Sequence, residues 1–264
     1  MHIICASICY RGYEADEVAA TLKYAPALGY THMEIHGPLV WSVDAAENFD
    51  LAGIKRAVDA SGMTCSGLYP PNWGGKDEAD VAARAHAIAR CVEYTRELGG
   101  THISTSGAEP HGTPGALDRV IECGRQVLDL VSADTPIKLT MEPHFGNILQ
   151  DWDDFARIID AIPDERLGLC VDTGHFHSAG VDTAAFIREF APRIYAVHFK
   201  DHIGTISVGI GRGDIDLRRE VEALKEVGYQ GGLTIELEVE DPENLPKYTE
   251  EAYLYVSGLL GQKL

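Results

Sequence analysis

Short apolar runs rich in β-forming residues alternate with longer amphipathic stretches eight times along the 264-residue chain. Strand and helix patterns that alternate without long breaks predict a parallel sheet. Eight such units, in a chain close to the roughly 250 residues typical of the fold, favour a single (β/α)8 TIM barrel over an open sheet. We predict strands over residues 3–9, 32–35, 64–69, 102–106, 138–142, 167–172, 194–199 and 232–237. We predict helices over residues 15–28, 51–61, 77–98, 117–132, 152–162, 183–190, 217–227 and 242–258.

The ends of the predicted helices carry ordinary stop signals, such as Gly62, Gly228 and Pro163. No glycine-rich dinucleotide fingerprint follows the first strand, and the glycine cluster at 209–213 is better interpreted as a flexible loop after the seventh strand. No low-complexity linker divides the sequence, so we expect residues 1–264 to form one domain.

The net charge of −19 makes nucleic acid and acidic membrane surfaces poor partners, because both require a basic protein surface. No apolar run approaches the roughly 18 residues of a membrane span. The first residues lack a basic signal-peptide region, and the six cysteines form no C-x-x-C pair. These features predict a cytoplasmic protein with reduced, mostly buried thiols.

Four consecutive predicted strands, the fifth to the eighth, end in a side chain that can bind a metal: Glu142, Asp172, His198 and Glu236. The carboxyl ends of all barrel strands meet at one mouth, which carries the active site in this fold. Each residue taken singly is equally well explained as a helix cap or a salt-bridge partner. Together, three carboxylates in a half-buried site would repel one another unless a cation neutralised them. We therefore predict one divalent metal ion, Mn2+ foremost, with Mg2+, Co2+ or Zn2+ as alternatives.

The residues around these ligands resemble the motifs of the xylose isomerase-like TIM barrel superfamily. More narrowly, they resemble its sugar isomerase/epimerase branch, which includes ketose 3-epimerases, hydroxypyruvate isomerases and inosose-processing enzymes. The motifs are MEPH at 141–144, VDTGH at 171–175, VHFKD at 197–201 and TIE at 234–236. The resemblance implies that the four predicted ligands bind one divalent metal and that Glu142 and Glu236 are acid and base. It also implies substrate contacts from His175 and from Arg212 in the loop after the seventh strand, and assembly as a dimer or tetramer.

This site predicts a metal-dependent isomerase or epimerase that acts on a small keto sugar or sugar derivative. A metal-bound carbonyl acidifies the neighbouring C–H, a carboxylate removes the proton, and an enediolate results. Return of the proton gives an epimer or an isomer, whereas loss of a β-substituent gives elimination. A lyase is therefore the alternative, and the Glu142-x-His144 pattern resembles 3-dehydroshikimate dehydratases, in which the histidine is a proposed base. An enzyme that cleaves a 3-keto glycoside would use the same scaffold.

Three further hypotheses remain open. Lys200 lies two residues after His198, so strand periodicity turns both side chains inward. Lys200 then binds substrate or pairs with a carboxylate. His144 acts as a base, hydrogen bonds the substrate or orients a metal ligand. Trp73 covers a sugar face or packs within its loop.

Two other classes of protein fit the sequence less well. A noncatalytic sugar-binding barrel would not need two flanking glutamates. A nuclease of the same superfamily would need further metal-binding histidines and a less acidic surface.

Overall fold

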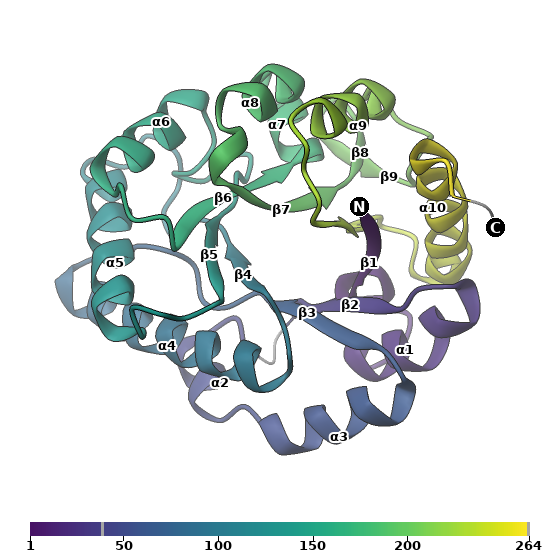
Figure 1. Cartoon of the computed structure of the whole chain (residues 1–264), viewed down its shortest axis with the longest axis horizontal. Coiled ribbons are helices and arrows are strands. Elements are labelled where there is room, and N and C mark those ends of the chain that lie inside the picture. The colour runs from purple at the N-terminus through teal and green to yellow at the C-terminus, as the bar shows by residue number, and fades with distance from the viewer. Residues whose placement is uncertain (38–39, 263–264) are drawn as a thin grey trace.

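Eight parallel strands close into a barrel in the order β1-β10-β7-β6-β5-β4-β3-β2, which confirms the predicted (β/α)8 fold (Figure 1). The computed structural model describes residues 1–37 and 40–262. Adjacent strands pair in parallel all the way round, and β1 closes the barrel against β10. The barrel strands are β1 His2–Ala6, β2 His32–Ile35, β3 Thr64–Leu68, β4 His102–Thr105, β5 Lys138–Met141, β6 Leu167–Asp172, β7 Ile194–Phe199 and β10 Gly232–Ile235.

Helices surround the strands as an outer ring, which is plain in the view of Figure 1. The α-helices are α1 Glu17–Tyr24, α2 Val43–Glu47, α3 Leu51–Ser61, α4 Glu78–Glu97, α5 Ala116–Leu130, α6 Trp152–Ala161, α7 Thr173–Ala179, α8 Thr183–Glu189, α9 Leu217–Glu226 and α10 Leu245–Leu260. Short 3-10 helices are η1 Ser7–Tyr10, η2 Ala25–Leu28, η3 Ala191–Arg193 and η4 Pro242–Asn244.

Several parts of the fold differ from the prediction. The first strand ends at Ala6, and the predicted remainder of it forms η1. The sequence analysis also did not predict α2 and α7, which have five and seven residues. Helices of one or two turns leave too little periodicity to be distinguished from a loop.

Aspartates begin many of the helices, and this uses part of the acidity of the chain. Asp16, Asp50, Asp77 and Asp182 each accept a hydrogen bond from a backbone N–H in the first turn of the following helix. Gly62 ends α3 with a φ of 76°, a left-handed conformation that a residue with a Cβ adopts only with strain. These local signals place each helix between its two strands.

The loop after β7 carries an antiparallel hairpin, β8 Asp201–Ile203 with β9 Ile206–Val208, which the sequence analysis did not predict. The Asp201 carboxylate accepts hydrogen bonds from the backbone N–H groups of Gly211 and Gly213. The segment predicted as a flexible loop is therefore tied back to the carboxyl end of β7.

All six cysteine side chains are buried, in agreement with the prediction of mostly buried thiols. Within residues 1–37 and 40–262, none of the helices combines the length and the apolar character needed to traverse a lipid bilayer.

Candidate metal centre and active site

The structure brings Glu142, Asp172, His198 and Glu236 together at the carboxyl ends of four adjacent strands. Glu142 follows β5, Asp172 ends β6, His198 lies near the end of β7, and Glu236 follows β10. The register of the sheet pairs His198 with Asp172 on one side and with Thr234 on the other, so these ends are level. One ligand atom from each of the four buried residues lies within 4.8 Å of the others.

The donor atoms at this centre fit a divalent cation. His198 Nδ1 contacts Glu142 Oε1 and lies 3.1 Å from Glu236 Oε2. Among the described residues, Glu236 Oε2 and Asp172 Oδ2 are buried and accept no well-formed hydrogen bond, although His198 Nδ1 and Lys200 Nζ lie at ion-pair distance from them. Buried carboxylate oxygens without a hydrogen bond are costly unless a cation or a proton satisfies them. A set of carboxylate oxygens and one imidazole nitrogen suits a hard or borderline divalent metal.

The charges of the centre are strongly coupled. Burial raises the pKa of Asp172 to about 8, with Glu142 and Glu236 adding to the rise and Lys200 opposing it. Burial also disfavours the charged form of His198, but the surrounding anionic groups, Glu142 among them, hold its pKa well above its ordinary value. Protons on these groups thus limit the repulsion among the carboxylates, and a divalent cation would take over that role.

Lys200 directly follows β7 and turns inward, two residues after His198 as strand periodicity predicts. Its Nζ lies 2.8 Å from Glu238 Oε2, 3.1 Å from Glu236 Oε1 and 3.3 Å from Asp172 Oδ2. Burial opposes the ammonium form, but the carboxylates hold the pKa of Lys200 well above its usual value. The structure therefore places a fixed positive charge against the carboxylates of the candidate metal centre.

Two further predicted site residues, the catalytic candidate His144 and the substrate-binding candidate His175, are stacked beside Lys200. The rings of His144 and His175 lie 3.9 Å apart between centroids. His175 Nε2 lies 3.0 Å from Lys200 Nζ, and burial together with that ammonium depresses the pKa of His175 well below its ordinary range. His175 is therefore a neutral imidazole near pH 7, suited to hydrogen bonding a substrate hydroxyl.

A cavity of about 350 Å³ opens on the metal centre and is large enough for a monosaccharide-sized ligand. Five of the predicted site residues line it, but Arg212 is not among the lining residues. Arg212 instead pairs with Glu251 at 2.5 Å and lies over the ring of Tyr248 on α10. The lining residues are Ile8, Arg11, His36, Trp41, Tyr69, Asn72, Ser106, Glu142, His144, Asn147, His175, Lys200, Glu236 and Glu238.

Several lining residues were not assigned to the site from the sequence. Glu238 could have been found, because it follows Glu236 by two residues on the same face of the chain. Arg11 and Trp41 carry no such signal, and they come from the loops after β1 and β2, with the guanidinium 4.3 Å from the ring centroid. Trp73 is fully buried and donates its indole N–H to the Thr140 carbonyl, so of its two roles packing is the one observed.

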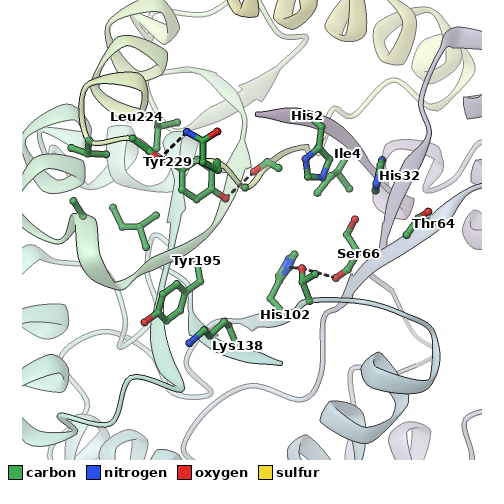
Figure 2. Close-up of a pocket in the computed structure, with 18 of the residues that line it drawn as sticks. His2, Ile4, His32, Thr64, Ser66, His102, Lys138, Tyr195, Leu224 and Tyr229 are labelled. Atoms are coloured by element: carbon green, nitrogen blue, oxygen red, sulfur yellow. Dashed lines mark hydrogen bonds between the residues drawn. The ribbon is translucent and has the colours of Figure 1, made fainter. Parts of the chain in front are cut away.

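A larger cavity of about 600 Å³ lies at the opposite end of the barrel (Figure 2). Its walls include His2, His32, His102 and Lys138, which belong to the amino-terminal halves of their strands. None of the described residues that line it is an aspartate or a glutamate. The cavity therefore lacks the carboxylate pair of the mouth, and in this fold the amino-terminal face serves stability.

Comparison with known proteins gives relatives named for rhizopine catabolism and for inosose dehydration. The rhizopine catabolism protein MocC of Rhizobium meliloti is 28% identical over 224 residues, covering 72% of this chain and 67% of that protein. An inosose dehydratase of Yersinia enterocolitica is 29% identical over 199 residues, covering 66% of this chain and 65% of that protein. The chain thus spans about two thirds of the length of these relatives.

Solved structures share the fold over nearly the whole chain. The IolI protein with a bound zinc atom superposes with a TM-score of 0.79 at 15% identity, covering 99% of this chain and 98% of that one. D-allulose 3-epimerase from Methylomonas sp. in complex with D-allulose gives 0.80 at 17% identity, covering 98% and 96%. The sequence pattern of one family matches residues 22–256. With that match and the barrel described above, the chain belongs to the xylose isomerase-like TIM barrel family.

Proposed function

We propose that this protein is a divalent-metal-dependent isomerase or epimerase that moves a proton next to the carbonyl of a keto sugar or sugar derivative. The observation that carries the proposal is the pair Glu142 and Glu236, two buried carboxylates that share one centre with His198 and Asp172 and also line the cavity. A site that only bound a sugar would not need this concentration of buried charge.

Glu142, Asp172, His198 and Glu236 would hold the metal, and Mn2+ is our first candidate because most of the donors are oxygens. When bound, the ion would polarise the substrate carbonyl and so acidify the adjacent C–H. The zinc in the IolI structure belongs to that protein and keeps Zn2+ among the alternatives.

The side chains of this protein supply the proton handling and the orientation of the substrate. Glu236 lies against Lys200, which keeps its carboxylate ionised and ready to accept a proton. Glu142, protonated from solvent, would donate its own proton to the intermediate, and Glu236 would afterwards release to solvent the proton that it removed. His175 and Lys200 would hydrogen bond the oxygens of the substrate. His144, stacked on His175, would support that contact or act as a second proton carrier.

A dehydratase is the second candidate, and the curated relatives named inosose dehydratase favour it. Elimination begins with the same proton removal but also needs a proton donor for the departing hydroxyl group. Lys200 and His144 offer such donors within the cavity. The two candidate functions therefore differ after the first step and not in the first step itself.

One experiment distinguishes an isomerase or epimerase from a dehydratase. The metal-loaded protein is incubated in D2O with a panel of keto sugars and cyclic polyol ketones, and the products are analysed by mass spectrometry and NMR. Deuterium at the carbon next to the carbonyl with no loss of water indicates an isomerase or epimerase. Loss of one water indicates a dehydratase. Neither exchange nor water loss with any member of the panel would contradict both.

The acid/base assignment has its own test. Glu236→Gln keeps the shape of the side chain but removes its ability to accept a proton, so we expect turnover to fall by about 10²–10⁴-fold. Glu240→Gln, on the exposed continuation of the same segment, is the matched control and should leave turnover unchanged. Turnover of Glu236→Gln equal to that of the unmodified protein would show that Glu236 is not the base.

A further inference from the structure

A fully buried carboxylate, Glu34, lies behind the metal centre in the interior of the barrel. Glu34 belongs to β2, and its side chain is 0% exposed. Its Oε1 accepts a hydrogen bond from His198 Nε2 at 3.1 Å. Its Oε2 accepts one from Thr234 Oγ1 at 2.9 Å and another from His102 Nε2 at 3.3 Å. Glu34 thus joins residues of β7, β10 and β4 on the barrel axis.

Glu34 is a carboxylate withdrawn from both the solvent and the cavity at the mouth. A buried carboxylate is costly unless its oxygens are hydrogen bonded, and here both oxygens have partners. Glu34 does not line the cavity at the mouth, so a contact with substrate does not account for it.

The two nitrogens of His198 face different groups. Nδ1 faces Glu142 and Glu236, whereas Nε2 faces Glu34. A histidine that binds a metal through one nitrogen commonly donates its other N–H to a carboxylate, which fixes the ring and makes the ligand more basic.

We infer that Glu34 is a positioning residue that presents Nδ1 of His198 to the metal and raises the metal affinity of the site. His102 holds Glu34 in place from the far side. The inference rests on the metal requirement of the proposed function, but it adds a role for two residues that touch neither metal nor substrate.

His102 continues the arrangement toward the opposite end of the barrel. Its Nδ1 lies 3.1 Å from Thr101 Oγ1, and its ring is part of the wall of the 600 Å³ cavity in Figure 2. Hydrogen bonds therefore connect the metal ligand with this cavity through the barrel interior. His32 lines the same cavity and hydrogen bonds to Thr31, so it is a matched control that makes no hydrogen bond to Glu34.

The test measures metal affinity, with Zn2+ and Mn2+ as probes, by competition with a chromogenic chelator. We expect Glu34→Gln to weaken binding about 10- to 100-fold, the usual range for losing a carboxylate behind a metal-binding histidine. His102→Leu and Thr234→Val each remove one donor to Glu34 and should weaken binding several-fold. His32→Leu should bind as the unmodified protein does.

A spectroscopic measurement reports on the position of the imidazole itself. In zinc-loaded protein with 15N-labelled histidine, the His198 signals should show Nδ1 bound to the metal and a protonated Nε2. In Glu34→Gln the signal of this N–H should move and its exchange with water should accelerate, which a loss of packing elsewhere would not produce.

The outcomes distinguish this inference from the proposed function. If the unmodified protein binds neither metal, the metal-dependent function fails. If it binds metal and the Glu34, His102 and Thr234 variants bind within twofold of it, the inference is overturned. If Glu34→Gln does not fold, by circular dichroism, the His102 and Thr234 variants decide in the same way.

Discussion

At the scale of single residues, Lys200 shows how the site is balanced electrostatically. It is an ammonium 1% exposed, held among Asp172, Glu236 and Glu238. A buried charge persists only with partners, and removal of one member leaves the others uncompensated. Lys200 therefore contributes to the stability of the carboxylate cluster as well as to the proposed contacts with substrate.

We predict that Lys200→Met lowers the free energy of unfolding of the metal-free protein by about 3–5 kcal/mol. Addition of a divalent metal should recover part of this loss, because the ion neutralises the same carboxylates. Urea unfolding with and without metal measures both effects. Lys247→Met, at an exposed position on α10, is the control. If Lys200→Met is as stable as the unmodified protein, Lys200 does not compensate the charge of the buried carboxylates.

At the scale of elements, helix α9 carries an ionisable group in an unfavourable place. Glu220 is only 6% exposed, and its Oε2 lacks a hydrogen-bond partner among the described residues. Burial raises the pKa of Glu220 to about 8, from an ordinary value of 4.5. The folded protein therefore binds this proton more tightly than the unfolded chain does. The protonated Glu220 therefore makes a contribution to the free energy of unfolding that is fully present below pH 4.5 and is lost as the pH rises toward 8.

We predict that Glu220→Gln removes this pH dependence and makes the protein more stable at pH 8 by on the order of 2 kcal/mol. The measurement is thermal or urea unfolding between pH 5 and pH 8. Glu222→Gln, an exposed position on the same helix, changes the net charge equally and should have little effect. Parallel pH profiles for the unmodified protein and Glu220→Gln would show that Glu220 is already paired in the folded state.

At the scale of the whole molecule, the carboxyl ends of four strands meet at the candidate metal centre. A metal that binds only the folded chain stabilises it in proportion to the logarithm of its concentration, by about 2.7 kcal/mol at 100 times the dissociation constant. Without the ion, buried carboxylates from β5, β6 and β10 face one another at the barrel mouth. A bound ion would therefore link the stability of the barrel to its proposed chemistry.

We predict that a chelator lowers the Tm of the metal-loaded protein and that re-addition of metal restores it in a concentration-dependent manner. Asp172→Asn, which removes one predicted ligand, should reduce this response. Differential scanning calorimetry with elemental analysis of the same samples provides the measurement. If the protein takes up no metal when incubated with an excess of it, and its Tm does not respond to the chelator, the prediction of a metal site at the barrel mouth is wrong.

The periodicity of the sequence was sufficient to predict the barrel, because the alternation of strand and helix is a local property that every unit repeats. The same alternation brings Glu142, Asp172, His198 and Glu236 to one mouth, since parallel strands in register end at one level. The inward direction of Lys200 follows from the same period of two.

Only the tertiary structure decided which other side chains reach the centre. Glu34 contacts His198 across 164 positions of sequence, and Arg11 meets Trp41 from a different loop. The glycine-rich segment after β7 bends back under the control of Asp201, and Arg212 consequently pairs with α10 rather than lining the cavity. Local pattern thus determined the scaffold of this protein and the four side chains of its candidate metal centre. Packing between distant segments determined what surrounds that set, because such contacts have no period in the sequence.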